Sequence, residues 1–178
     1  MVYVLMVDGF EDIEALEPID IMRRAGISVK TVGVYGKKVT SSHDVMVETD
    51  ILIDDVEKED MDMLVLPGGP GHTNLDESEK AHQLISYAYE NDIYLAAICA
   101  SPSILGKLGL LDGKNYTCFP GFEGFCKGGI FSGDKAVLDG KILTARGAGA
   151  ATDFGFKMVD ILKGKEISDK LRKDMQYI

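Results

Sequence analysis

Residues 93–105 read Ile-Tyr-Leu-Ala-Ala-Ile-Cys-Ala-Ser-Pro-Ser-Ile-Leu, and this stretch decides the fold. Its first half is a short apolar run without a polar face, which is typical of a strand buried on both sides of a parallel sheet. Its second half predicts a helix, because Ser101 is a good cap and Pro102 suits the first helical position. The sequence therefore predicts a strand that turns abruptly into a helix at Cys99.

Cys99 occupies the position in which such a turn presents a nucleophile. The hinge residue stands at the carboxyl end of the sheet, and backbone N–H groups of the helix start point toward it. A cysteine at a helix N-terminus has a lowered pKa, so we predict a depressed pKa for Cys99. The alternative is a buried structural cysteine, because free cysteine is among the most buried residue types.

Strand-like apolar runs alternate with helical stripes along the rest of the chain. We expect strands at 2–7, 27–34, 60–66 and 115–118, a small hairpin within 39–49, a second hairpin of 135–138 with 141–145, and helices at 13–24, 78–91, 148–162 and 165–175. The glycine-rich residues 120–133 give no clear prediction. The alternation predicts an α/β, flavodoxin-like three-layer sandwich with a mostly parallel central sheet.

Length and charge limit the possible functions. A chain of 178 residues predicts a single domain, residues 1–178, with a sizeable core. The net charge of −10 disfavours nucleic acid and membrane surfaces as partners, since both select a basic face. No apolar run suits a signal peptide or a bilayer span, so a cytoplasmic location is the default expectation.

The cysteines do not form a recognisable framework. Three cysteines in a chain of this size argue against structural disulfides. Cys118 and Cys126 lie eight residues apart with no nearby histidine, so we interpret them as incidental and predict no metal site.

Three loops follow strands at the carboxyl edge of the expected sheet, where such folds place their sites: 8–14, 67–71 and 99–100. Gly68 and Gly69 serve as turn residues, or they let a backbone N–H approach a developing anion. Glu14 lies in the first turn of a helix, where an acid is usually a helix-dipole charge. In the alternative interpretation, Glu14 points over the end of the sheet toward Cys99.

Several motifs along the chain match the pattern of one family. They are Glu-Asp-Ile-Glu at 11–14, Pro-Ile-Asp-Ile-Met-Arg-Arg-Ala-Gly-Ile at 18–27, Leu-Pro-Gly-Gly at 66–69, Ala-Ala-Ile-Cys-Ala at 96–100 and Leu-Thr-Ala-Arg-Gly at 143–147. Together they resemble the ThiJ/PfpI superfamily, and more narrowly its DJ-1 branch. The resemblance runs through nearly the whole chain in order.

The resemblance implies a flavodoxin-like homodimer with a reactive cysteine, here Cys99. It implies that Glu14 is protonated and hydrogen-bonds the sulfur, which is reasonable because burial and a neighbouring anion both raise a carboxyl pKa. The backbone N–H groups of Gly69 and Ala100, with Gly68 beside them, would line an oxyanion site. The first helix, 13–24, would pack against its two-fold mate.

Two positions depart from the family pattern. Members with aldehyde chemistry often carry a histidine where Phe119 stands here, and protease-like relatives carry one where Ala100 stands. No histidine is therefore an obvious general base. His72, after the glycine loop, and His43, in a turn that lies near the partner's site in the family, remain candidates for the pocket.

Two functions of different classes fit these residues. In the first, the Cys99 thiolate attacks a small 2-oxoaldehyde and Glu14 moves protons, which gives a cofactor-independent glyoxalase or deglycase. In the second, an oxidant converts Cys99 to a sulfinate, and the protein is a redox sensor or stress chaperone without turnover. The expected partners are accordingly a small aldehyde or an oxidant, and no cofactor is expected.

Overall fold

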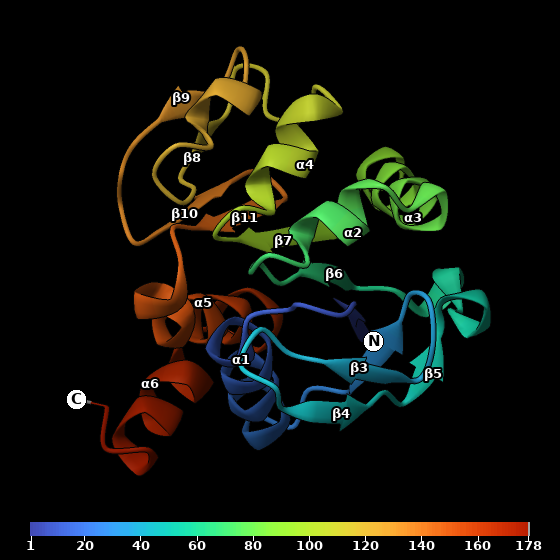
Figure 1. Cartoon of the computed structure of the whole chain (residues 1–178). Helices are drawn as coiled ribbons and strands as arrows, with labels where there is room; N and C mark the ends of the chain where they lie inside the picture. Colours follow the sequence, from blue (N-terminus) through green and yellow to red (C-terminus); the bar gives the residue numbers. More distant parts are fainter. Residues whose placement is uncertain (178) are drawn as a thin grey trace.

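A seven-stranded sheet forms the centre of the computed structural model, which describes residues 1–177. The strand order is β10-β11-β7-β6-β1-β2-β5 (Figure 1). The strands are β1 (Val2–Met6), β2 (Val29–Gly33), β5 (Ile51–Leu52), β6 (Met63–Leu66), β7 (Tyr94–Ile98), β10 (Ala136–Asp139) and β11 (Ile142–Ala145). Neighbouring strands are parallel except the β10–β11 hairpin, so the predicted flavodoxin-like sheet is confirmed.

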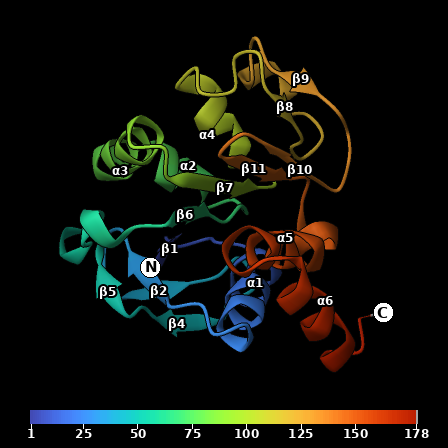
Figure 2. The same ribbon diagram turned by 180° about the vertical axis from the view of Figure 1, so that it is seen from behind.

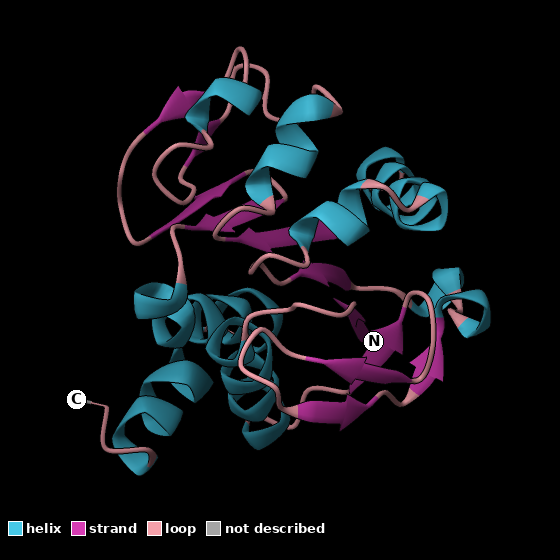
Figure 3. Cartoon of the chain, viewed as in Figure 1, coloured by secondary structure: helices cyan, strands magenta, loops and turns pink. Residues whose placement is uncertain are grey.

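Helices cover both faces of this sheet (Figures 1 and 2). One face carries α1 (Asp12–Arg24), α5 (Ala151–Lys163) and α6 (Lys165–Asp174), and the other carries α2 (His72–Asp76), α3 (Glu79–Glu90) and α4 (Pro102–Lys107). Figure 3 shows the resulting helix–sheet–helix layers. The three-layer sandwich expected from the sequence is therefore present.

The apolar strands have no polar face because each strand contributes side chains to two cores, one on each side of the sheet. In β1, Val2, Val4 and Met6 belong to the core under α1 and α5. Tyr3 and Leu5 belong to the core under α3 and α4. Alternate side chains point to opposite faces of a strand, so burial on both faces selects a continuous apolar run.

The two predicted hairpins are confirmed. Strands β3 (Lys38–Thr40) and β4 (Met46–Glu48) pair antiparallel, beginning one residue before the expected range of 39–49, and β10 pairs with β11 across Gly140. The strand expected at 60–66 begins only at Met63, because Lys58–Asp60 form a 3-10 turn. A 3-10 turn at Ala148–Ala150 likewise delays the start of α5.

Several short elements were not predicted. They are β5, α2, the 3-10 turns at Ile53–Asp55 and Glu123–Phe125, and β9 (Ile130–Phe131), which pairs with β8 (Asn115–Tyr116). None spans enough residues to show a hydrophobic period. Within residues 1–177, no helix combines the length and the apolar character needed to cross a bilayer.

Candidate active site

Cys99 stands on a sharp turn between β7 and α4. Its φ angle of 66° lies in the left-handed region, which a residue with a side chain adopts only where its surroundings impose it. Two backbone hydrogen bonds fix it there: the Cys99 N–H donates to Ala145 at 2.8 Å, and the Phe119 N–H donates to the Cys99 carbonyl at 2.8 Å. The half-buried thiol is thus held at the carboxyl end of the sheet, as the sequence predicts.

Glu14 lies in the first turn of α1, but it is not a solvated helix-end charge. Its side chain is 1% exposed, and the Gly68 N–H donates to its Oε2 at 3.1 Å. The Ala148 N–H donates to the same carboxyl group, and Glu11 caps the helix by accepting from the Glu14 N–H at 2.8 Å. Burial raises the pKa of Glu14 to about 7. Hydrogen bonds to the carboxyl group oppose this rise, and the bond with Cys99 has the largest effect among them.

The Cys99 thiol hydrogen-bonds the Glu14 carboxyl group, so the structure brings the two predicted residues together. Burial first, and the charge of Glu14 second, raise the pKa of Cys99 to about 12. The backbone N–H groups of Gly69 and Ala100 face the sulfur and lower this pKa, but they are outweighed. The predicted depression of the Cys99 pKa is therefore wrong, because burial of the thiol, and next the charge of Glu14, outweigh the N–H groups of the helix start.

The glycine loop approaches this pair so closely that side chains do not fit. A Cβ atom at Gly68 would lie 2.5 Å from the Cys99 Cβ and 2.5 Å from Glu14 Oε2. At Gly69, φ is 87° and a Cβ would lie 2.6 Å from the Glu11 nitrogen. Gly69 therefore supplies the left-handed turn, and Gly68 permits the close approach of the loop to Cys99 and Glu14.

Phe119 borders the site. Its ring lies 3.2 Å from the place of a Cβ at Gly147, and that place is 3.9 Å from Glu14 Oε1. The side chain is 47% exposed and carries no titratable group. Phe119 thus presents an apolar ring at the border of the site.

His72 and His43 lie beside the loops of the site but are bonded elsewhere. The His72 Nδ1 is 3.0 Å from the Gly69 carbonyl oxygen, and its ring meets Phe122 edge-on at 5.1 Å. The exposed His43 bonds Asp12 Oδ2 through Nδ1 at 2.8 Å, which raises the pKa of this histidine. His72 thus braces the glycine loop, and His43 sits at the start of α1.

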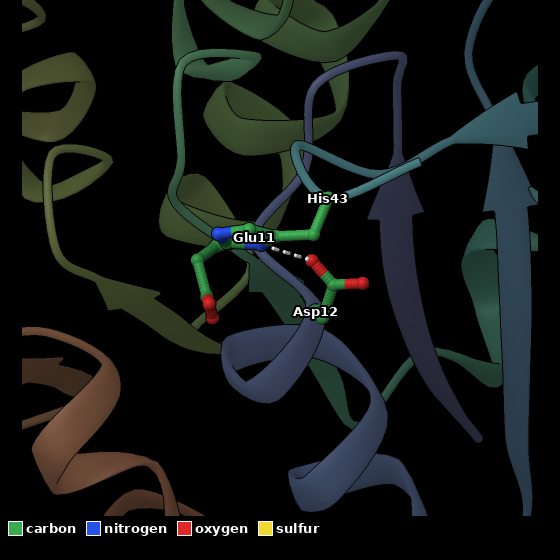
Figure 4. A group of neighbouring side chains, drawn as sticks. All are labelled: Glu11, Asp12 and His43. Atoms are coloured by element: carbon green, nitrogen blue, oxygen red, sulfur yellow. Dashed lines mark hydrogen bonds and ion pairs between the residues drawn. The ribbon is translucent and has the colours of Figure 1, made fainter. Parts of the chain in front are cut away.

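Glu11, Asp12 and His43 form a group that the sequence analysis did not find (Figure 4). One ligand atom from each lies within 4.8 Å of the others. Ser41 and His43 already hydrogen-bond the Asp12 carboxylate, at 2.6 and 2.8 Å. These contacts account for the group without an ion. The sequence analysis missed this group because Asp12 and His43 are 31 positions apart in the chain.

The fold and the site define a class: a flavodoxin-like α/β protein whose strand–helix elbow carries a cysteine bonded to a buried glutamate. Residues 1–161 match the DJ-1/PfpI family, and the chain belongs to this family. It is 34% identical to the Protein dj-1beta of Drosophila melanogaster over 97% of this chain and 94% of that protein. The crystal structure of that DJ-1beta superposes with a TM-score of 0.92, at 33% identity, over 98% of this chain and 96% of the other.

Two further relatives carry names that describe an activity. The "Glutathione-independent glyoxalase DJR-1.2" of Caenorhabditis elegans is 28% identical over 93% of this chain and 89% of that protein. The "Deglycase TK1284" of Thermococcus kodakarensis is 31% identical over 83% of this chain and 90% of that protein. These similarities support a DJ-1-like function for the chain.

Proposed function

We propose that the protein converts small 2-oxoaldehydes to hydroxy acids, as a cofactor-independent enzyme of the glyoxalase or deglycase type. The observation that carries the proposal is the hydrogen-bonded pair of Cys99 and buried Glu14, with the N–H groups of Gly69 and Ala100 facing the sulfur. The glyoxalase and deglycase names of two relatives support the same reaction class.

The chemistry begins with a proton transfer inside the pair. Glu14 takes the thiol proton, and the Cys99 sulfur attacks the aldehyde carbon to form a hemithioacetal. The N–H groups of Gly69 and Ala100 stabilise the oxyanion that develops during the attack. A pKa of about 7 suits Glu14 to both accepting and donating a proton near neutral pH.

The following steps redistribute protons and add water. Glu14 moves a proton from the aldehyde carbon to the neighbouring carbonyl carbon through an enediol, which leaves a thioester on Cys99. Water then cleaves the carbon–sulfur bond and releases the hydroxy acid. The aldehyde carbon is oxidised and the ketone carbon is reduced within one molecule, so no external electron acceptor is needed.

Lactate formation from methylglyoxal without added cofactor tests this proposal. We expect turnover by the wild type and none by Cys99→Ser or Glu14→Gln. Glu17→Gln is the matched control, because Glu17 lies on the same helix and bonds Thr152 rather than the site. Equal lactate formation by Cys99→Ser and the wild type would refute the mechanism.

A redox role is the second candidate, and Phe119 favours it. The role needs no general base, and Phe119 supplies none at the position where aldehyde enzymes have histidine. A Cys99 sulfinate would accept hydrogen bonds from protonated Glu14 and from the N–H groups of Gly69 and Ala100. Peroxide-dependent gain of two oxygen atoms on Cys99, without lactate formation, would favour this sensor or chaperone function over the enzyme.

A further inference from the structure

The structure places Cys118 and Cys126 side by side, although the sequence suggested that they are incidental. Both thiols are free and almost completely buried, at 1% and 2% exposure. The side chains of Cys118 and Cys126 lie within hydrogen-bonding reach of each other, and the Tyr116 hydroxyl reaches the Cys126 sulfur as well. The proposed reaction at Cys99 uses neither of them.

The pair lies between α4 and the turn that follows Phe119. The Cys126 sulfur is 3.8 Å from the Pro102 carbonyl oxygen and 3.8 Å from that of Phe122. A Cβ atom at Gly106 would lie 2.6 Å from the Cys126 Cα, so the glycine lets the cysteine backbone pack directly on α4. Two segments of the chain meet at these sulfurs.

The hydrogen bonds make the two thiols unequal. The bond from Cys118, aided by Tyr116 and opposed by burial, lowers the pKa of Cys126. The same bond, together with burial, raises the pKa of Cys118. Cys126, whose pKa is the lower of the two, suits the role of the attacking cysteine, and Cys118 suits that of the resolving cysteine.

The segment that carries Cys126 lies at the surface. Within 119–131, Cys126 alone is buried, whereas most of its neighbours are exposed. Apart from a single 3-10 turn and the two-residue strand β9, this segment has no regular structure. Segments with few buried contacts open locally at low free-energy cost, which gives a small oxidant a route to the sulfurs.

We propose that Cys118 and Cys126 form a second redox site, a dithiol that a hydroperoxide oxidises reversibly to a disulfide independently of Cys99. The Cys126 sulfur attacks the peroxide, the O–O bond breaks, and water or an alcohol leaves as Cys126 becomes a sulfenic acid. The Cys118 sulfur then attacks the sulfenic sulfur and displaces water. The two cysteines lose two hydrogen atoms, and the peroxide is reduced to water, or to water and an alcohol.

The two cysteines lie next to the two segments that support Cys99. Cys118 immediately precedes Phe119, whose N–H holds the Cys99 carbonyl at 2.8 Å. Cys126 contacts Pro102, the first residue of α4. A disulfide would tie these two supports of Cys99 together.

The test uses Cys99→Ser protein, in which the proposed reaction and Cys99 oxidation are both absent. The folded protein is treated with hydrogen peroxide, its remaining thiols are alkylated, and it is digested without reduction. Trypsin releases both cysteines in the single peptide 115–127. We expect this peptide to lose two hydrogen masses, to escape alkylation, and to regain both thiols with dithiothreitol. Cleavage after Glu123 should then give two fragments that separate only on reduction.

Adding Cys126→Ala to Cys99→Ser should abolish the loss of hydrogen. If that double variant does not fold, the fragment linkage in the folded Cys99→Ser protein decides the question alone. Full alkylation of both cysteines after peroxide treatment would overturn the proposal, and so would oxygen addition without a linkage. Either outcome leaves the Cys99 mechanism untouched, because the lactate assay tests that mechanism separately.

Discussion

At Glu14, burial has a consequence for stability as well as chemistry. The pKa rises from 4.5 to about 7 on folding, so between these values the unfolded chain has lost the proton that the folded chain keeps. Stability therefore falls as pH rises through this window, by about 3 kcal/mol at most. We expect Glu14→Gln, which cannot ionise, to lack this part of the fall. Urea unfolding at several pH values measures it, with Glu17→Gln as the control that keeps the wild-type slope.

The charge of Glu14 also controls the thiol of Cys99. Because the carboxylate raises the pKa of Cys99, removing its charge in Glu14→Gln should lower that pKa. The midpoint of iodoacetamide labelling against pH should move to lower pH in the variant. An unchanged midpoint would mean that Glu14 does not act on the sulfur electrostatically.

Cys99 should be the first cysteine to react with an alkylating agent in the folded protein. The reason is access rather than a low pKa, since Cys99 is half-buried while Cys118 and Cys126 are fully buried. Peptide mapping after brief labelling checks this order. Faster labelling of Cys118 or Cys126 would contradict it.

Among the structural elements, the glycine loop at 67–71 has no room for a side chain at Gly68 or Gly69. Gly68→Ala places a methyl group 2.5 Å from both Cys99 and Glu14, so atoms must move. Overpacking of this kind costs about 1–3 kcal/mol, and we expect the Cys99–Glu14 hydrogen bond to weaken with it. Urea unfolding and the labelling midpoint of Cys99 report the two effects. Gly36→Ala is the control, because a Cβ there meets nothing within 4 Å and neither effect is expected.

The sequence predicts the long elements because their patterns are local. The apolar run before Cys99 and the Ser101–Pro102 start each suffice to define the elbow. Strand β5 and helix α2 are too short to carry such a pattern. The contact of Cys118 with Cys126 and the raised pKa of Cys99 depend on how distant segments fold onto each other, which no local pattern shows.

For the whole molecule, the expected homodimer remains a prediction, and the ion pairs of α1 do not bear on it. Along α1, Arg24 pairs with Asp20 at 2.6 Å and Arg23 pairs with Asp50 at 3.0 Å, all within one chain. A charge reversal at Arg24 would therefore disturb the helix as well as any contact between subunits. The charges of α1 do not require a partner chain.

Ile13 offers a cleaner test of assembly. It is 48% exposed on the first turn of α1, the helix that the family resemblance places at the two-fold contact, so a charge there should disfavour a second copy. We expect light scattering to show a dimer for the wild type and a larger monomer fraction for Ile13→Glu. Tyr89→Glu, on α3 across the sheet, is the matched control and should stay dimeric. A monomeric wild type would refute the dimer.

The N–H donors that bind the Glu14 carboxyl group become available at different times during synthesis. Glu14 emerges early in synthesis, and β1 beside it becomes the middle of the sheet, yet its donor at Ala148 emerges near the end. Contacts of such long sequence separation form late and slow the folding of a chain. A nascent chain can therefore assemble much of its sheet while the Glu14 carboxyl group still lacks its Ala148 donor, and the surroundings of Cys99 are complete only after α5 packs against α1.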